Sequence, residues 1–90
     1  MKFKNIEAFL AVAENLNFSK AAEQLGCSQS AVTMQIKELE NELGALLFER
    51  MNKSVKLTAA GGMFLRYAQK VSYDTNALLS RFSGLDPVEG

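Results

Sequence analysis

The amino-acid sequence predicts a mostly α-helical domain, and three features support that fold class. Two short helical patterns, 19–25 and 28–43, are separated by Gly26. Two short stretches of alternating apolar and polar residues follow them between 46 and 57. From Thr58 a long apolar stripe recurs at helical spacing. Together they predict a winged helix-turn-helix, with three helices and a two-stranded wing in residues 1–58, a long helix over 59–84 and a linker tail at 85–90.

A first helix is expected over about residues 5–15. Its core-facing stripe has the i, i+3, i+4, i+7 spacing of an amphipathic helix and consists of Ile6, Phe9, Leu10 and Ala13. Phe18 follows shortly after this helix. We expect its ring to fill the core between the first helix and the next two.

The two helices that follow should form the helix-turn-helix. Ser19 can cap the first of them, because its hydroxyl can accept a hydrogen bond from the free N–H groups of the first turn. Ala22 is small enough to let two crossing helices approach closely. Gly26 can end the helix in the left-handed conformation. Cys27 is then expected to point inward as a small core residue.

The second helix of the pair has two distinct faces. Ser28 can cap its start and Gly44 can end it. The buried stripe recurs at +4, +3 and +4 and consists of Val32, Ile36, Leu39 and Leu43. The opposite, polar face consists of Ser30, Thr33, Met34, Lys37 and Asn41, with Gln29 at its flank.

No acidic residue occurs between Glu23 and Glu38. The polar face therefore suits a helix whose first turns enter the major groove of DNA, where base edges offer donors and acceptors to Gln, Ser and Thr. The alternative is an ordinary helical hairpin with a solvated polar face. The small residues and the intervening glycine, at this mutual spacing, favour the helix-turn-helix.

The wing is predicted from the two alternating stretches. An isolated two-stranded hairpin is barely stable in water, so apolar side chains must anchor it on the helices. The residues expected to do so are Leu46, Phe48, Val55 and Leu57. Arg50 and Lys53 should lie near the tip and Lys56 on the outer face, where cations can reach phosphates or an adjacent minor groove. The alternative is a solubilising hairpin with ordinary surface cations.

A last helix is predicted over 59–83, capped by Thr58. Its apolar stripe consists of Phe64, Tyr67, Val71, Thr75, Leu78 and Phe82. The stripe runs for about 20 residues, or roughly 30 Å, which exceeds what so small a core can cover. We therefore expect the remainder to pair with a second copy of the chain. The alternative is a helix that folds back and completes only its own core. Gly61 and Gly62 should permit close packing of the helix start rather than bind an anion.

Composition narrows the possible functions. One cysteine and no histidine exclude a disulfide framework, the usual zinc fingers and a histidine-based catalytic triad. The sequence also has no paired catalytic acids and no glycine-rich phosphate loop. Neither an enzyme nor a cofactor or metal site is therefore expected. Without a secretory signal or a membrane-length apolar stretch, a cytoplasmic location is expected.

The net charge of zero argues mildly against binding to nucleic acid, whose affinity depends on phosphate contacts. The distribution of charge argues the other way. Five basic residues and no acidic residue occur from Arg50 to Tyr73. The acids concentrate instead at Glu38, Glu40, Glu42 and Glu49. A neutral total thus combines a basic segment with an acidic one.

Over roughly residues 3–83, the order of elements resembles the N-terminal DNA-binding domain of LysR-type transcriptional regulators. The segments that carry this resemblance are 9–14 (FLAVAE), 18–25 (FSKAAEQL), 28–33 (SQSAVT), 35–40 (QIKELE), 43–44 (LG), 47–50 (LFER) and 57–61 (LTAAG). Members of that family are usually bacterial regulators whose linker helix pairs two subunits and leads to an effector-binding domain. The resemblance implies a homodimer on double-stranded DNA, a possible tetramer in a longer protein, and a small-molecule effector bound only by a domain absent from these 90 residues.

The resemblance also implies roles for individual residues. The base-reading positions are Gln29, Ser30, Thr33 and Met34. The wing contacts are Arg50 and Lys53, and the further candidates for the DNA backbone or minor groove are Ser28, Lys37 and Lys56.

Three positions depart from the family's pattern. Ser30 stands where the family often has Pro, Thr33 where Ser is frequent, and Met34 where Arg is common. Arg can bind guanine through two hydrogen bonds, worth about 1–3 kcal/mol of discrimination, whereas Met can only contact a thymine methyl or fill space. A less guanine-dependent site or weaker specificity is expected. The zero net charge and Met34 leave one alternative function, a protein-interaction module that dimerises without specific DNA binding.

Overall fold

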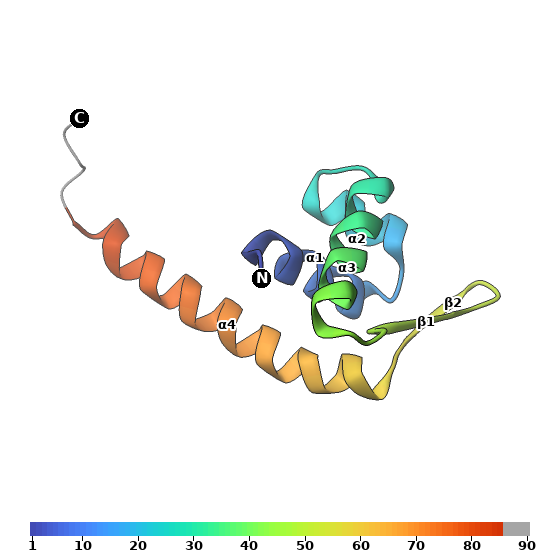
Figure 1. Ribbon diagram of the computed structural model, residues 1–90. Helices are drawn as coiled ribbons and strands as arrows, with labels where there is room; N and C mark the ends of the chain where they lie inside the picture. Colours follow the sequence, from blue (N-terminus) through green and yellow to red (C-terminus); the bar gives the residue numbers. More distant parts are fainter. Residues whose placement is uncertain (86–90) are drawn as a thin grey trace.

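A computed structural model describes residues 1–85 and confirms the predicted mostly α-helical fold (Figure 1). The tail from residue 86 lies outside the described part. The elements are α1 (Phe3–Asn15), α2 (Phe18–Leu25), α3 (Gln29–Leu43), β1 (Phe48–Met51), β2 (Ser54–Leu57) and α4 (Ala59–Ser83). Helices α1 to α3 form a compact body, from which the wing and α4 project in different directions.

One aromatic cluster joins the body, the wing and α4. The ring of Phe9 on α1 is fully buried and lies 5.2 Å from that of Phe48 on β1 and 4.9 Å from that of Phe64 on α4. Phe18, at the start of α2, contacts Phe48 edge to face at 6.0 Å, so the prediction that it fills the core is confirmed. Aromatic pairs at such distances add to the stabilisation from buried area. The wing and α4 are therefore held on the body by the same core.

The helix ends agree with the prediction at most positions. Gly26 and Gly44 both adopt left-handed conformations at the ends of α2 and α3, and Ser28 Oγ accepts a hydrogen bond from Ala31 N–H. Two predictions were wrong. Asn17, not Ser19, caps α2, because its Oδ1 accepts from Lys20 N–H at 2.8 Å. Cys27 is exposed rather than inward, and it is its backbone N–H that contacts α2, by donating to the carbonyl of Ala22 at 3.0 Å.

The buried face of α3 ends before the helix does. Val32, Ile36 and Leu39 are buried as predicted, but Leu43 remains 40 % exposed. Leu43 is the last residue of α3. At the other side of this end, Lys2 and the amino group of Met1 form ion pairs with Glu38 (3.0 Å) and Glu42 (3.4 Å). The hydrogen bond from Lys2 lowers the pKa of Glu38.

The approach to the wing differs from the predicted alternation. Leu47 is buried and Leu46 is 66 % exposed, so Leu46 does not anchor the wing. The strand begins only at Phe48, and Leu46 and Leu47 lie before it at the end of the turn that connects α3 to the wing, where the two-residue period of a strand does not apply. The carboxylate of Glu40 accepts a hydrogen bond from Leu47 N–H at 2.8 Å and thereby holds this turn against α3.

The two strands pair antiparallel, with Phe48 opposite Leu57, Glu49 opposite Lys56 and Arg50 opposite Val55. Successive residues of a strand point to opposite faces. Phe48 and Arg50 therefore share the face that lies against the body, and Lys56 lies on the outer face as predicted. Asn52, in the turn, adopts a positive φ of 55°, which Asn tolerates better than most residues.

Helix α4 begins in close contact with the rest of the fold. The hydroxyl of Thr58 accepts from Gly61 N–H at 2.9 Å and donates to the carbonyl of Leu46. Phe64 and Ala68 are buried in the core of the same chain, whereas the second half of α4 extends past the body (Figure 1). Only the first half of the helix is thus covered by its own domain.

Candidate nucleic-acid interface

The polar face of α3 is available to a ligand over its first two turns. The side chains of Gln29, Ser30 and Lys37 are exposed, Met34 is 70 % exposed, and Thr33 is half-buried. These positions lie at i, i+1, i+4, i+5 and i+8, which is one helical face. The structure therefore places all four predicted base-reading residues and Lys37 on the same side of α3. Ser28, at the N-terminus of this face, is exposed but uses its hydroxyl as the helix cap.

Arg50 lies beside that face. Its guanidinium stacks over the ring of Phe18 at 3.8 Å from the centroid, a geometry that favours cation–π attraction. A hollow of about 360 Å³ lies between the wing and α3, and Arg50, Thr33 and Lys37 all contribute to its lining. The fold thus brings a wing cation, whose side chain is held by an aromatic ring, next to the candidate reading helix.

Lys53, in the turn of the wing, lies near the start of α3. A second hollow, of about 180 Å³, is lined by Lys53 and Asn52 from the wing turn and by Gln29 and Ser19 from the helix-turn-helix. Arg50 contributes to this hollow as well as to the first. The two hollows make the wing and the polar face of α3 one continuous surface.

Lys56 is placed differently from the other two wing cations. It lies on the outer face of the wing, and its cross-strand neighbour is Glu49. A carboxylate directly opposite offsets part of the positive potential of a lysine. We therefore expect Lys56 to contribute less than Arg50 or Lys53 to any contact with a polyanion.

Sequence reasoning missed two residues of this surface. Ser19 Oγ donates a hydrogen bond to Gln29 Oε1 at 2.8 Å, across the turn of the helix-turn-helix. Phe18 supports Arg50 in addition to filling the core. Neither contact follows from local spacing, because each joins residues that only the tertiary fold brings together.

The acidic residues of α3 all have partners within the chain, and of the three only Glu40 lines the hollow that Arg50, Thr33 and Lys37 share. The acids of α3 begin at Glu38, after the first two turns, and Glu38 and Glu42 are engaged by the N-terminus of the chain. Glu40 is engaged by the turn before the wing. Zero net charge is therefore compatible with a basic surface formed by α3 and the wing.

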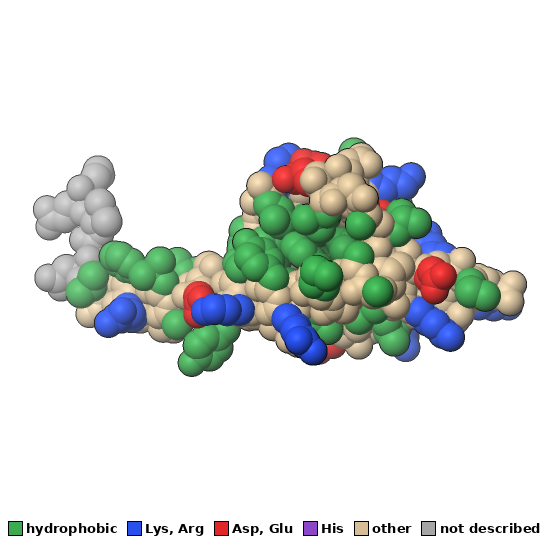
Figure 2. All heavy atoms as spheres, turned by 60° about the horizontal axis from the view of Figure 1, so that its bottom comes forward, with side chains coloured by type: hydrophobic (Ala, Val, Ile, Leu, Met, Phe, Trp, Pro, Cys, Tyr) green, Lys and Arg blue, Asp and Glu red, His purple; other side chains and the backbone are tan. Residues whose placement is uncertain are grey.

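On another side of the molecule, α4 presents an apolar face that its own domain does not cover. Positions 64, 68, 71, 75, 78 and 82 recur at +4, +3, +4, +3 and +4, so they form one continuous stripe. Beyond Thr75 no element within residues 1–85 covers the stripe: Leu78 and Phe82 are 52 % and 60 % exposed, and Leu79 beside the stripe is 58 % exposed. Figure 2 shows hydrophobic side chains along this projecting end.

The predicted pairing residues therefore divide into two groups. Phe64 is buried in its own core and Val71 packs against that core, so neither offers a free face. Tyr67, Leu78 and Phe82 are about half exposed or more, and Thr75 is half-buried. Phe64 packs against Phe9 of α1, because the first half of α4 covers that helix, and its role in pairing stays a prediction.

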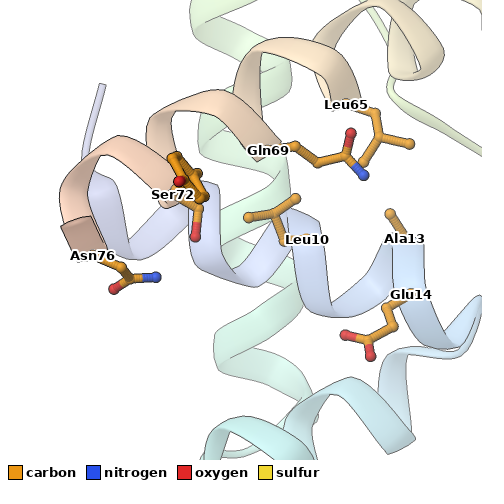
Figure 3. A pocket seen from close by; sticks show the side chains of 8 residues that line it. Leu10, Ala13, Glu14, Leu65, Gln69, Ser72 and Asn76 are labelled. Atoms are coloured by element: carbon orange, nitrogen blue, oxygen red, sulfur yellow. The ribbon is translucent and has the colours of Figure 1, made fainter.

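A hollow of about 480 Å³ lies between α1 and α4 (Figure 3). Leu10, Ala13 and Glu14 of α1 face Leu65 and Gln69 of α4 across it, and its lining is partly polar.

Over residues 1–85 no three His, Cys, Asp or Glu side chains are grouped so as to hold a metal ion. None of the described helices is both long and apolar enough to cross a bilayer.

The fold has three helices, a left-handed glycine that ends α2 and begins the turn, an exposed polar face on α3 and a flanking wing, which together define a winged helix-turn-helix DNA-binding module. Residues 3–62 match the family model described as "Bacterial regulatory helix-turn-helix protein, lysR family". The chain belongs to this family of bacterial transcriptional regulators, and it corresponds to the family's DNA-binding domain.

Known proteins agree with this assignment. The chain is 48 % identical over 71 residues to the uncharacterised HTH-type transcriptional regulator YwqM of Bacillus subtilis and 49 % identical over 71 residues to the regulator ShiR of Corynebacterium glutamicum. Each match covers 79 % of this chain and 24 % of the relative. The chain thus spans about a quarter of the length of these relatives.

Two solved structures are similar over nearly the whole chain. The CbnR DNA-binding domain in complex with DNA has a TM-score of 0.85 at 38 % identity, covering 90 % of this chain and 93 % of that one. The BenM DNA-binding domain with benA site 1 DNA has a TM-score of 0.86 at 36 % identity, covering 92 % and 96 %. Both structures are complexes with DNA.

Proposed function

We propose that this chain binds double-stranded DNA in a sequence-specific way, with α3 in the major groove and the wing on the backbone or in the adjacent minor groove. The observation that supports this most is the placement of the wing cations. Arg50 and Lys53 line the same surface as Thr33 and Gln29, through two adjoining hollows. Cations beside the polar face of α3 favour DNA binding, because contacts with phosphates supply most of the affinity for DNA.

The chemistry of the face suggests a division of roles. Gln29, Ser30 and Thr33 offer donors and acceptors to base edges, and Met34 offers only apolar contact. Lys37 and the start of α3 at Ser28 can approach phosphates, since a helix N-terminus favours anions. Arg50 and Lys53 provide the charge that makes binding strong and salt-dependent.

The reading role of α3 can be tested by truncation. We expect Gln29→Ala and Thr33→Ala to relax sequence preference, each by roughly 1–3 kcal/mol of discrimination at the base it contacts. The measurement is fluorescence anisotropy with the DNA upstream of the protein's own gene and a scrambled duplex, over a series of salt concentrations. Unchanged preference in both variants would show that α3 does not read the groove.

The wing offers a matched pair of lysines. Lys53→Ala should weaken binding to all sequences and reduce the slope of log K against log salt by about 1, as expected for the loss of one phosphate contact. Lys56→Ala should change the slope less, because Lys56 lies opposite Glu49 on the outer face. If the slope of log K against log salt is the same for Lys53→Ala and the unmodified protein, the wing turn does not contact DNA phosphates.

The uncovered end of α4 supports a second part of the proposal. We infer that two copies associate through this helix, with Leu78 and Phe82 of each copy in the contact and Tyr67 and Thr75 at its margin. An apolar stripe with alternating +3 and +4 spacing is the pattern by which helices pair. A homodimer would also present two copies of α3 to two half-sites of DNA.

The chain's share of its relatives' length suggests its place in a longer protein. We propose that residues 1–58 form the DNA-binding unit, that 59–84 form the linker helix, and that 85–90 lead to an effector-binding domain. In that longer protein the dimer could assemble further into a tetramer. A regulator that binds chromosomal DNA would act in the cytoplasm.

The competing function is a protein-interaction module that dimerises through α4 without specific DNA binding. Met34, which replaces a guanine-reading Arg in the family's pattern, and the zero net charge favour it. The same anisotropy experiment separates the two functions. No binding to either duplex at low salt would support the interaction module, whereas a preference that persists at physiological salt would support the regulator.

A further inference from the structure

The side chain of Gln29 is exposed on the polar face of α3, and one hydrogen bond orients its amide group. Its Oε1 accepts a hydrogen bond from the hydroxyl of Ser19 at 2.8 Å. Ser19 is the second residue of α2 and is not needed as the helix cap, because Asn17 has that role. Its hydroxyl is therefore available to act on Gln29.

The surroundings of this hydrogen bond favour one orientation of the amide. The N-terminus of α2 carries a partial positive charge, and Lys53 and Arg50 line the same hollow as Gln29 and Ser19. Positive potential on that side attracts the amide oxygen. Because the oxygen and nitrogen of an amide point in different directions, Nε2 with its two N–H donors is then turned away from Ser19.

This orientation matters for base readout. A freely rotating Gln can bind adenine through two hydrogen bonds, donating to N7 and accepting from N6. When the oxygen is directed toward Ser19, the side chain mainly offers donors. Donors match the two acceptors N7 and O6 of guanine and O4 of thymine, whereas adenine offers them only N7, so guanine gives these donors one more partner than adenine does.

We propose that Ser19 is a specificity-determining positioning residue: it holds the Gln29 amide so that its N–H group faces the major groove, and it thereby favours base pairs that present acceptors over the bidentate contact with adenine. This inference rests on the proposed function, because it requires α3 to read the groove. It does not require Ser19 itself to contact a base.

The test is selection of bound duplexes from a randomised DNA library, followed by sequencing. It uses the unmodified protein, Ser19→Ala, Ser19→Thr and Gln29→Ala. Gln29→Ala identifies the position that Gln29 reads. At that position we expect Ser19→Ala to raise the preference for adenine over guanine by about fivefold, the equivalent of one neutral hydrogen bond. Ser19→Thr keeps the hydroxyl and should retain the original preference.

Two further readouts separate positioning from other roles. The salt dependence of binding and the melting temperature should be the same for Ser19→Ala and the unmodified protein, since Ser19 is exposed and does not cap α2. A lower salt slope with unchanged base preference would show that Ser19 contacts a phosphate, and would overturn the inference. A preference unchanged in Ser19→Ala but altered in Gln29→Ala would overturn this inference alone. No change in Gln29→Ala, or no enrichment by the unmodified protein, would overturn the proposed reading function itself.

Discussion

Replacing Gly61 by alanine should lower the free energy of unfolding by about 3 kcal/mol, the upper part of the range for overpacking a close contact. A Cβ atom at this position would overlap the carbonyl oxygen of Leu47 and would lie 2.9 Å from Leu57 Cδ2 and 3.1 Å from the carbonyl carbon of Leu47. The Leu47 carbonyl cannot move aside easily, because it accepts a hydrogen bond from Thr58 N–H at 3.0 Å. The start of α4 would have to move away from the turn before β1.

Gly62 provides a matched control in the next position of the same helix. A Cβ atom there would meet nothing within 4 Å. Gly62→Ala should therefore leave stability unchanged or raise it by up to about 1 kcal/mol, the gain in helix propensity. Urea denaturation followed by circular dichroism, at one fixed protein concentration, measures both variants. A Gly61→Ala protein as stable as Gly62→Ala would mean that α4 does not approach Leu47 this closely.

Replacing Leu78 by aspartate should convert the proposed dimer to a monomer. Leu78 lies on the uncovered half of the α4 stripe, so its change should leave the core of each domain intact. A carboxylate buried without a partner in a helix pair costs about 3 kcal/mol or more. That corresponds to a dissociation constant raised at least about 100-fold. Light scattering over a range of protein concentrations would report the change in mass.

The control is Ser80→Asp, which adds the same charge two residues away. Ser80 does not belong to the apolar stripe, and its exposed side chain makes it a neutral position for folding and pairing. The Ser80→Asp protein should keep the mass of the unmodified protein. If Leu78→Asp also keeps that mass, the contact between copies lies elsewhere than on the stripe. If both variants become monomeric, general repulsion between charges accounts for the effect.

Much of the architecture could be predicted because its signals are local. Ser28 and Thr58 cap their helices, and Gly26 and Gly44 end theirs, through hydrogen bonds and backbone angles that involve residues within four positions. The apolar stripes of α1 and α3 are also local, since a helical period needs only the sequence. The polar face of α3, with its four predicted base-reading residues, follows from the same period.

Predictions were less successful where two nearby residues could each take the same role and packing decided between them. Ser19 and Asn17 are both good helix caps, and the fold uses Asn17 while Ser19 is occupied by Gln29. Leu46 and Leu47 are chemically identical, and only the turn held by Glu40 determines which one is buried. The two residues of each pair have nearly equal local preferences, for capping a helix in the first pair and for burial in the second. A contact with a distant residue therefore decides which of the two is used.

By itself the sequence determined the element order, most helix ends, the polar face of α3 and the continuous stripe of α4, because each depends on short-range periodicity or on one residue's backbone preference. Only the tertiary structure decided how the surface is assembled. It placed Arg50 over Phe18, joined Ser19 to Gln29, set Gly61 against Leu47, and divided the α4 stripe into a half inside the core and a half beyond it. These contacts join residues 10 to 32 positions apart, or depend on where the body ends, and no local period encodes either.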